Sequence, residues 1–385
     1  MKAVALHASF APFHVTRLRC AQSLGEDLGH QLVSFQLADS QSDYAWPQVK
    51  DHEGGLQSMT LFPNRNRWSL SRREIRKGLR SHLNDVQPDV VALPGWGASE
   101  SLAGLGWSLN NEKATVVFVD SHPFGNDNSR FKEWTRGLLV RRFNAALVAG
   151  KLHIRYLESL GFPAERCLVG YDVVDNDQFL IARQENEARQ APVLLSCLRL
   201  LPRKNALGVL EVLAHQAKEW VWIVAGDGPD LSALKEKVAA LGLSGRVQLL
   251  GHVPYANLPA VYAGADVYLQ PSLYEPWGLA VNEAMASGLP VLVSDRCGSR
   301  ELVQEGVNGF TFDPAKPESL GSVLSQMLTL RDRWINFGAA SQLIISKWGP
   351  DLFARNFWQA CEMAIETRRS KKGPSPFDRV VGMAL

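Results

Sequence analysis

The chain has 385 residues, of which 46% are hydrophobic and 21% charged, a composition typical of a soluble globular protein long enough for two domains. Its formal net charge of +2 gives no electrostatic reason to expect a nucleic-acid partner. The five cysteines are scattered and lack CxxC spacing, which argues against a disulfide framework and a zinc site and favours a reducing cytoplasm.

The first half of the chain alternates short apolar runs with helical patterns. We expect strands and helices in this order: strand 2–8, helix 16–28, strand 31–38, helix 71–86, then strands 88–96, 114–122 and 145–151. Residues 40–68 are polar and predict a loop. The first run is too short for the apolar core of a signal peptide, and no run in the chain reaches the roughly 18 residues of a membrane helix.

The pattern restarts after a charged, apolar-poor stretch at 180–192, which predicts a linker. Strands are expected at 192–200, 219–229, 246–253, 265–272, 290–295 and 308–314. Helices are expected near 205–218 and at 231–243, 256–264, 278–288, 298–306, 317–328 and 351–369.

Two such strand–helix series predict an α/β chain with two Rossmann-like domains facing a central cleft. The N-terminal domain is expected at 1–180 and the C-terminal domain at 181–350, with a helix at 351–370 returning to the N-terminal domain. The tail at 371–385 is expected to be mobile. A basic cluster that begins at Arg368 leaves contact with anionic lipid as an alternative to a plain solvated tail.

The stretch YEPWGLAVNE, residues 274–283, places Glu275 after a strand and Glu283 eight positions later on a helix. The pattern predicts that Gly278 opens this helix and that the N–H groups of Gly278, Leu279 and Ala280 lack helical partners. Such a helix start favours an anionic ligand. Paired carboxylates also occur in glycosidases and metal sites, so the rest of the chain must decide their role.

The whole block from 271 to 313 resembles the E-x7-E signature of the retaining GT-B glycosyltransferases of family 4. The resemblance implies a GT-B fold and a hexosyltransferase that moves a sugar from a nucleotide-diphosphate sugar to an acceptor with retention. It implies that Glu275 accepts hydrogen bonds from sugar hydroxyls and that Glu283 accepts them from the ribose. The role of Trp277 stays open beyond lining the turn.

Other segments resemble the family in the same order along the chain. LRLLPRKN places Arg199 and Lys204 at the positions that contact the donor pyrophosphate, although Asn205 stands where glycine is usual. VAGDGP resembles a G-x-G-P turn, in which Gly226 is either a ligand contact or a requirement of the fold. RVQLLGHV places Gly251, His252 and Val253 near the nucleobase.

The N-terminal half resembles the family less closely. His122 ends a strand at a position where the family commonly carries a histidine beside the donor sugar. Asp175 matches an aspartate in the passage into the linker, and we assign it to the acceptor side. The first loop lacks the usual glycine pair, which leaves His14, Arg17 and Arg19 as loose candidates for acceptor contact.

We therefore expect a metal-independent, cytoplasmic glycosyltransferase that needs no cofactor beyond its donor substrate. Cationic side chains and the helix start would cover the pyrophosphate charge, so the D-x-D-like tripeptide at 175–177 is not read as a metal site. The acceptor is a glycan, a lipid or a small molecule, and lipid contact would place the protein at the inner membrane face. A UDP-sugar 2-epimerase and a non-catalytic sugar-nucleotide-binding protein stay open as alternatives; oligomeric state, sugar and base are undetermined.

Overall fold

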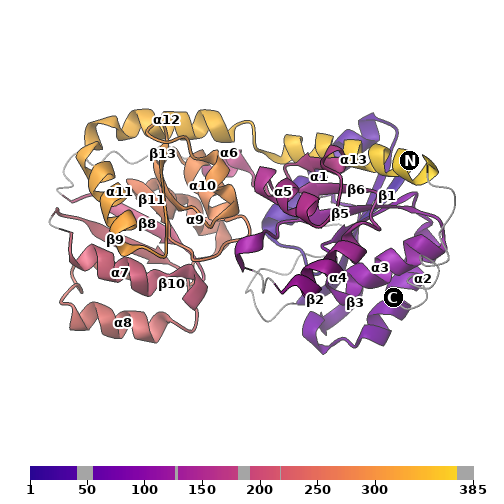
Figure 1. Ribbon diagram of the computed structural model, residues 1–385, viewed down its shortest axis with the longest axis horizontal. Helices are drawn as coiled ribbons and strands as arrows, with labels where there is room; N and C mark the ends of the chain where they lie inside the picture. Colours follow the sequence, from indigo (N-terminus) through magenta and orange to yellow (C-terminus); the bar gives the residue numbers. More distant parts are fainter. Residues whose placement is uncertain (41–54, 126–128, 181–190, 217, 371–385) are drawn as a thin grey trace. The chain divides into compact units, whose positions relative to one another are not determined.

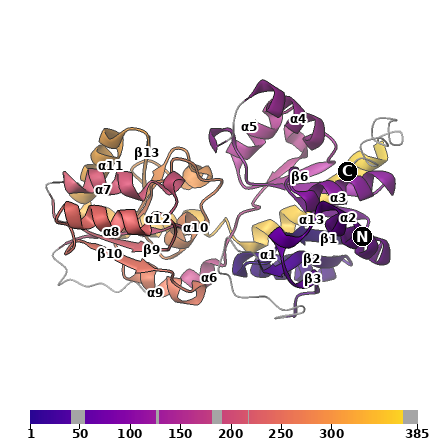
Figure 2. The same ribbon diagram turned by 90° about the horizontal axis from the view of Figure 1, so that it is seen from below.

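The computed structural model describes residues 1–40, 55–125, 129–180, 191–216 and 218–370. The chain forms two compact units (Figures 1 and 2). Unit 1 is Met1–Val173 together with the C-terminal segment from Pro350, and unit 2 is Val174–Gly349. The predicted linker at 180–192 falls largely outside the described residues, and so does the predicted mobile tail at 371–385.

Within the described residues, unit 1 contains a seven-stranded parallel sheet in the order β3-β2-β1-β4-β5-β6-β7. Its strands are β1 (Lys2–His7), β2 (Gln31–Ser40), β3 (Ser58–Asn66), β4 (Val90–Pro94), β5 (Ala114–Val119), β6 (Ala145–Val148) and β7 (Cys167–Val169). Its helices are α1 (Pro12–Asp27), α2 (Arg72–Val86), α3 (Ser99–Asn110), α4 (Arg130–Val140), α5 (Lys151–Ser159) and α13 (Pro350–Ser370). Helix α13 packs on α1 and on strands β5 and β6 (Figure 1).

The described part of unit 2 contains a six-stranded parallel sheet in the order β10-β9-β8-β11-β12-β13. Its strands are β8 (Val193–Cys197), β9 (Val221–Ala225), β10 (Val247–Gly251), β11 (Val267–Gln270), β12 (Val291–Ser294) and β13 (Gly309–Phe312). Its helices are α6 (Asn176–Phe179), α7 (Ala206–Ala214), α8 (Leu231–Ala240), α9 (Leu258–Ala263), α10 (Leu279–Ala286), α11 (Pro317–Thr329) and α12 (Trp334–Ile345). Helix α7 packs against α8 and α11, whereas α10 packs against α9 and α12.

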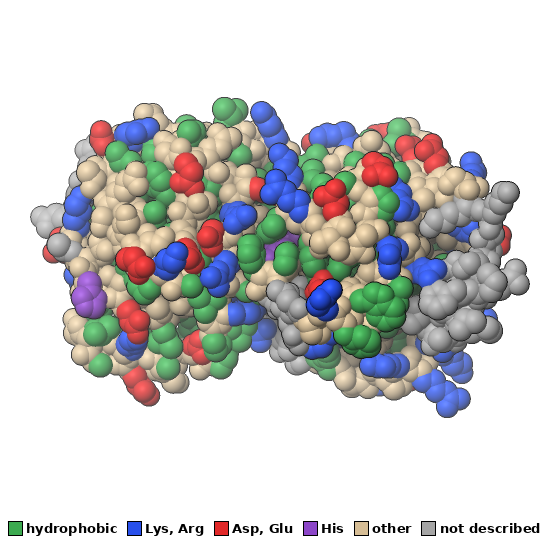
Figure 3. Space-filling view, in the orientation of Figure 1, with side chains coloured by type: hydrophobic (Ala, Val, Ile, Leu, Met, Phe, Trp, Pro, Cys, Tyr) green, Lys and Arg blue, Asp and Glu red, His purple; other side chains and the backbone are tan. Residues whose placement is uncertain are grey.

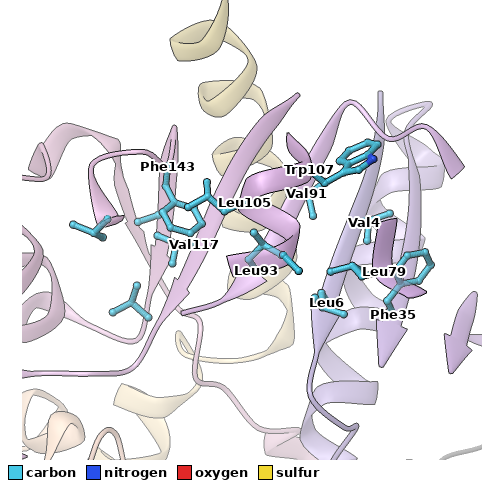
Figure 4. Packing of buried hydrophobic residues seen from close by; sticks show 14 of the residues in the cluster. Val4, Leu6, Phe35, Leu79, Val91, Leu93, Leu105, Trp107, Val117 and Phe143 are labelled. Atoms are coloured by element: carbon cyan, nitrogen blue, oxygen red, sulfur yellow. The ribbon is translucent and has the colours of Figure 1, made fainter. Parts of the chain in front are cut away.

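The central strands are hydrophobic on both faces because helices cover both sides of each sheet. Every residue of β5, β6, β11 and β12 is buried. In unit 1, strand side chains pack against α2 and α3 (Figure 4), as seen for Val4, Leu6, Phe35, Leu79, Val91, Leu93, Leu105 and Trp107. The continuous apolar runs in the sequence are therefore the interior of two doubly covered sheets.

Several expectations about individual elements were wrong. The range 40–68 is not a plain loop, because Ser58–Asn66 forms the edge strand β3 beside β2. The helix expected at 298–306 is only a short 3₁₀ turn, Gly298–Leu302. Helix α3 was not predicted, because most of its residues are buried and it lacks an amphipathic stripe.

The boundary between the units falls at Val173/Val174 rather than at 180/181. Helix α6 therefore belongs to unit 2, and so does Asp175, which we had assigned to the acceptor domain. The second crossing of the chain lies between Gly349 and Pro350, so α13 is part of unit 1.

Arg17 is fully buried in the interior of unit 1. Its guanidinium donates to the carbonyl oxygen of Tyr171 at 2.5 Å and to Asp172 Oδ1 at 3.4 Å, and it lies 4.2 Å from the centre of the Tyr171 ring. Burial and, to a lesser extent, the charge of Arg17 hold the pKa of His7 well below its usual range. The His7 ring is therefore neutral, and its Nε2 atom lies 3.4 Å from the Arg17 guanidinium. Through these contacts the Arg17 side chain joins α1 to the segment after β7. Its buried position gives no support to the expected contact with the acceptor, which stays a prediction.

Replacing Arg17 with alanine should lower the free energy of unfolding by about 3–5 kcal/mol, because it leaves the buried Asp172 carboxylate without its cation. Urea denaturation measures this loss. Arg19→Ala is the matched control, since Arg19 is exposed on the same helix and its loss should cost about 0.5 kcal/mol or less. Equal urea midpoints for the two variants would contradict a structural role for Arg17.

Candidate active site

The strand order of unit 2 changes direction between β8 and β11, which are neighbours in the sheet. Ligands of open α/β sheets bind outside the carboxyl ends of the strands at such a point. The segment after β8 leads to the 3₁₀ turn η5 (Pro202–Lys204), and the segment after β11 carries Glu275. The topology thus brings together two predicted site residues that lie 71 positions apart in the sequence.

Lys204 and Glu275 form an ion pair in which the ammonium group donates to Glu275 Oε2. Their side chains are only 11% and 10% exposed. The same carboxylate oxygen accepts from Ser272 Oγ at 3.2 Å and from Gln270 Nε2 at 3.3 Å. These additional hydrogen bonds help to offset the cost of removing both charges from water.

The residue after Lys204 explains a departure from the family pattern. Asn205 has φ +61° and ψ +28°, a left-handed conformation that glycine adopts freely and asparagine tolerates better than most residues. Its side-chain amide donates to the carbonyl oxygen of Pro271 at 3.3 Å. Asparagine therefore preserves the turn that orients the Lys204 side chain, and it adds a hydrogen bond to the segment that follows β11.

Gly278 lies at the start of α10 with φ +98°. A Cβ atom there would lie 2.9 Å from Cys297 Sγ and 3.2 Å from Glu275 Cγ, so a larger residue would push into the Glu275 side chain. The first N–H groups of α10, at Leu279 and Ala280, have no acceptor within the helix. The helix start therefore lies beside the Lys204–Glu275 pair, and together they form a region suited to a phosphate group.

Glu283 lies further along α10 and is 5% exposed. Tyr262 on α9 donates its hydroxyl hydrogen to Glu283 Oε2 at 2.7 Å. Burial raises the pKa of the Glu283 carboxyl to about 7, and the bond from Tyr262 opposes part of that shift. Burial also raises the pKa of Tyr262 well above its usual value, so its hydroxyl stays a donor.

A second buried tyrosine extends this group toward Glu275. Tyr268 on β11 donates to Gln270 Oε1 at 2.7 Å, and Gln270 donates to Glu275. The Tyr262 and Tyr268 rings lie 5.9 Å apart. The sequence analysis did not place these side chains in the site. The polar residues Gln270 and Ser272, at the end of an apolar strand, were a signal that polar groups gather there.

Trp277 is a structural residue of the turn that carries Glu275. Its ring is buried and stacks on Trp348 with centroids 5.6 Å apart, and its Nε1–H donates to Asn282 Oδ1 at 2.9 Å. Its carbonyl oxygen accepts from Ser299 N at 3.0 Å. These contacts hold the turn from both sides. The role of Trp277, which the sequence left open, is therefore to stabilise the turn that carries Glu275.

Gly226 is required by the fold. Its φ is +146°, and a Cβ atom there would lie 1.8 Å from the carbonyl oxygen of Leu198. Its N–H donates to the carbonyl oxygen of Gly251 at 2.8 Å, which ties the ends of β9 and β10 together. His252 is exposed and Val253 is half-buried, and their place near a nucleobase stays a prediction.

The remaining predicted residues are distributed over both units. Arg199 is half-buried between β8 and η5, and its carbonyl oxygen accepts from Leu201 N at 2.8 Å. Asp175 immediately precedes α6 of unit 2. In unit 1, His122 is fully buried with its ring 5.7 Å from that of His153, and His14 lies on α1 with its ring 4.5 Å from that of His7.

The described residues contain no group of three or more His, Cys, Asp and Glu side chains placed to hold a metal ion. Of the helices in the described ranges, none combines the length and the apolar character needed to cross a bilayer. On the face shown in Figure 3, basic and acidic side chains are interspersed rather than gathered by sign.

Comparison with known proteins links this site to a family. Residues 177–342 match the family model of glycosyl transferases group 1. An uncharacterized glycosyltransferase of Methanocaldococcus jannaschii, MJ1607, is 32% identical over 155 residues, which cover 40% of this chain and 38% of that protein. The GDP-mannose-dependent alpha-(1-6)-phosphatidylinositol monomannoside mannosyltransferase of Mycobacterium tuberculosis is 28% identical over 199 residues, 47% of this chain and 52% of that protein.

Among solved structures, Anabaena HepE in complex with UDP superposes with a TM-score of 0.73 at 19% identity, covering 94% of this chain and 100% of that one. The two parallel sheets with their helices are thus the GT-B fold. The matched segments span about two fifths and one half of the two curated relatives. The segment that matches the family model lies within unit 2.

The raised pKa of Glu283 makes a pH-dependent contribution to stability. Below the ordinary carboxyl pKa of 4.5 the group is protonated in both states; between 4.5 and 7 the native state binds more protons than the unfolded state. Stability from this group is therefore full at low pH and is lost as pH rises through 7. From pH 5 to pH 8, the free energy of unfolding of the wild type should fall by roughly 2–3 kcal/mol relative to Glu283→Gln.

Urea denaturation of both proteins at the two pH values measures this difference, and other titrating groups cancel in the comparison. Glu211→Gln serves as the control, because the Glu211 side chain is 57% exposed. A wild-type protein that tracks Glu283→Gln at both pH values would show that the buried carboxyl titrates normally.

Proposed function

We propose that the chain transfers a sugar from a nucleoside-diphosphate sugar to an acceptor hydroxyl. The observation that carries this proposal is the buried Lys204–Glu275 pair beside the start of α10, at the point in unit 2 where the strand order reverses. A diphosphate leaving group gains negative charge as the glycosidic bond breaks. Fixed cations and helix N–H groups stabilise that charge without reorganising.

The predicted charged residues of the donor site and the start of α10 each have a part in this mechanism. Lys204 donates to the diphosphate through the ammonium hydrogens that Glu275 leaves available, since an ammonium group has three donors. Arg199 supplies a second cation, and the N–H groups at the start of α10 complete the phosphate contact. Glu275 accepts from hydroxyls of the transferred sugar, and Glu283 accepts from the ribose.

Similar proteins support a nucleotide-sugar donor. HepE was solved with UDP and with UDP-glucose, and the mycobacterial relative is GDP-mannose-dependent. These two donors differ in base and sugar, so we propose the class of donor and leave the base open. Retention of the anomeric configuration rests on the resemblance to family 4. We further propose that His122 lies near the donor sugar and that no metal is needed, because side chains and a helix start supply the positive charge.

A donor screen by thermal unfolding tests the proposed function, with UDP-glucose and GDP-mannose as probes. A nucleotide sugar at 100 times its dissociation constant should raise the free energy of unfolding by about 2.7 kcal/mol. Turnover should require an added acceptor and release a nucleoside diphosphate. Failure of every nucleotide sugar to stabilise the protein would refute the donor site, and conversion of the donor to an epimer without acceptor would favour the epimerase alternative.

Lys204→Ala should weaken binding of the stabilising donor roughly 10- to 100-fold, the loss expected for one charge-assisted hydrogen bond. Lys237→Ala is the matched control, since Lys237 also pairs with a glutamate, Glu211, but on the exposed surface of unit 2. Isothermal titration of donor into both variants makes the comparison.

Lys204→Ala leaves the buried Glu275 carboxylate without its cation, so this variant could lose donor binding because it loses structure. The double variant Lys204→Met/Glu275→Gln removes both charges and should recover thermal stability without recovering donor affinity. Wild-type affinity in this double variant would show that the ion pair does not bind the donor.

A further inference from the structure

Glu283 is a buried carboxylate with few hydrogen-bond donors around it. Among the described residues, its one side-chain hydrogen bond comes from Tyr262, which donates to Glu283 Oε2 at 2.7 Å. An ionised carboxylate has about four acceptor positions, so a single bond leaves most of them unused. Removing such a group from water is costly unless a cation or further donors satisfy it. The ribose of a nucleotide sugar carries two neighbouring hydroxyl groups, which are donors of the kind that Glu283 needs.

The Tyr262 side chain is fully buried and held by aromatic rings from two other elements. Phe179 of α6 meets its ring edge-on with centroids 5.7 Å apart, and Tyr268 of β11 lies 5.9 Å away. The Tyr262 hydroxyl also lies 3.3 Å from the carbonyl oxygen of Ala280, three residues before Glu283 on α10. Its one hydrogen goes to the carboxylate, because a bond to an ionised acceptor is the stronger of the two. The ring contacts therefore fix the position from which Tyr262 holds Glu283.

The groups that interact electrostatically with Glu283 are neutral at neutral pH. Burial raises the pKa of each of them above its usual value, so each keeps its proton. These groups are the hydroxyls of Tyr255, Tyr262 and Tyr268 and the thiol of Cys197.

The elements that pack on α10 bring no cation to Glu283. They are α6, α9, α12, β11, β12 and the 3₁₀ turn Gly298–Leu302, and α12 and β12 contain no titratable side chain. The charged side chains on or directly beside the other elements are Asp175, Asp177, Arg300 and Glu301. None of these four moves the pKa of Glu283, which burial raises to about 7 and the bond from Tyr262 lowers in part.

We propose that Tyr262 is a positioning residue that holds Glu283 for the ribose of the donor, and that donor binding releases the carboxyl proton of Glu283 to the solvent. Hydroxyl groups that donate to a carboxylate favour its ionised form. The proton therefore passes from the carboxyl group to water, while the ribose hydroxyls stay neutral. The inference rests on the proposed nucleotide-sugar donor and goes beyond it, because it makes the affinity of the site depend on pH.

The direction of this dependence follows from the protons that each state binds. Below pH 7 the free protein carries a carboxyl proton that the complex has lost, so donor affinity falls as pH falls. The fall approaches roughly tenfold per pH unit, the limit for release of one proton, until the lower pKa of the complex is reached. Well above pH 7 the carboxyl group is ionised with and without donor, and affinity levels off.

Isothermal titration of UDP-glucose and GDP-mannose into the full chain at pH 5.5, 6.5, 7.5 and 8.5 tests the proposal. The diphosphate of these donors has no proton to lose in this range, so it does not mask the protein. The affinity for at least one donor should rise with pH and then level off. Titrations in two buffers of different ionisation enthalpy should show proton release at pH 6.5 that has largely disappeared at pH 8.5. The 2′-deoxy analogue of UDP-glucose should release less.

Tyr262→Phe removes the hydroxyl group and keeps the ring that Phe179 and Tyr268 contact. The ionised carboxylate then loses its donor, so the pH at which affinity levels off should rise by about one unit. Binding near pH 7 should weaken by up to about tenfold, and the two affinities should converge as pH rises. A merely structural role for Tyr262 would instead weaken binding equally at every pH.

Two further variants complete the comparison. Glu283→Gln cannot lose a proton, so its weaker binding should lack the rise between pH 5.5 and 7.5. Tyr156→Phe is the matched control, because Tyr156 is a buried tyrosine of unit 1 whose hydroxyl donates to another glutamate, Glu133, at 3.3 Å. Its pH profile should match that of the wild type.

Donor binding with the same affinity at all four pH values, and without proton release, would overturn this inference and leave the proposed function standing. A Tyr262→Phe profile parallel to that of the wild type would show that Tyr262 does not position Glu283. Unchanged proton release with the 2′-deoxy analogue or with Glu283→Gln would assign the proton to another group. Failure of both donors to bind at any pH would refute the donor site itself and, with it, the proposed function.

Discussion

The buried ion pair between Lys204 and Glu275 is the interaction around which the candidate site of unit 2 is arranged. An ion pair this far from water is costly, and it persists only where geometry and further hydrogen bonds compensate. The sheet supplies the geometry, because β8 and β11 are neighbours and their following segments meet at one edge. Gln270 and Ser272 supply the hydrogen bonds, and Asn205 holds the turn that directs the lysine.

The two glutamates of the E-x7-E block have different electrostatic surroundings. Glu275 faces a cation, whereas Glu283 is buried against the neutral hydroxyl of Tyr262 and has its pKa raised to about 7. Environments that differ in this way assign different tasks to identical side chains. In the proposed mechanism, Glu275 orients the Lys204 ammonium group and accepts from a sugar hydroxyl, whereas Glu283 accepts from the ribose. Neither arrangement resembles an acid–nucleophile couple.

The parallel strands and the central residues of the site could be predicted because their signals are local: continuous apolar runs for strands, and one dense motif for Glu275, Gly278 and Glu283. What could not be predicted depends on contacts between distant segments. Tyr262 carries no local sign that it will meet Glu283, and the burial of Arg17 is decided by the segment after β7. The edge strand β3 was missed because an edge strand has one exposed side and lacks a continuous apolar run.

The same limit applies to the unit boundary and to Trp277. A charged stretch predicted a linker near residue 180, but the chain enters unit 2 at Val174. Val173 and Val174 are both buried, so no polar stretch marks the boundary there. Trp277 is fixed by Trp348, a residue at the end of unit 2 that no local pattern connects to the Glu275 turn. A motif thus identifies candidate residues for the site, while the shape of the site is set by packing partners elsewhere in the chain.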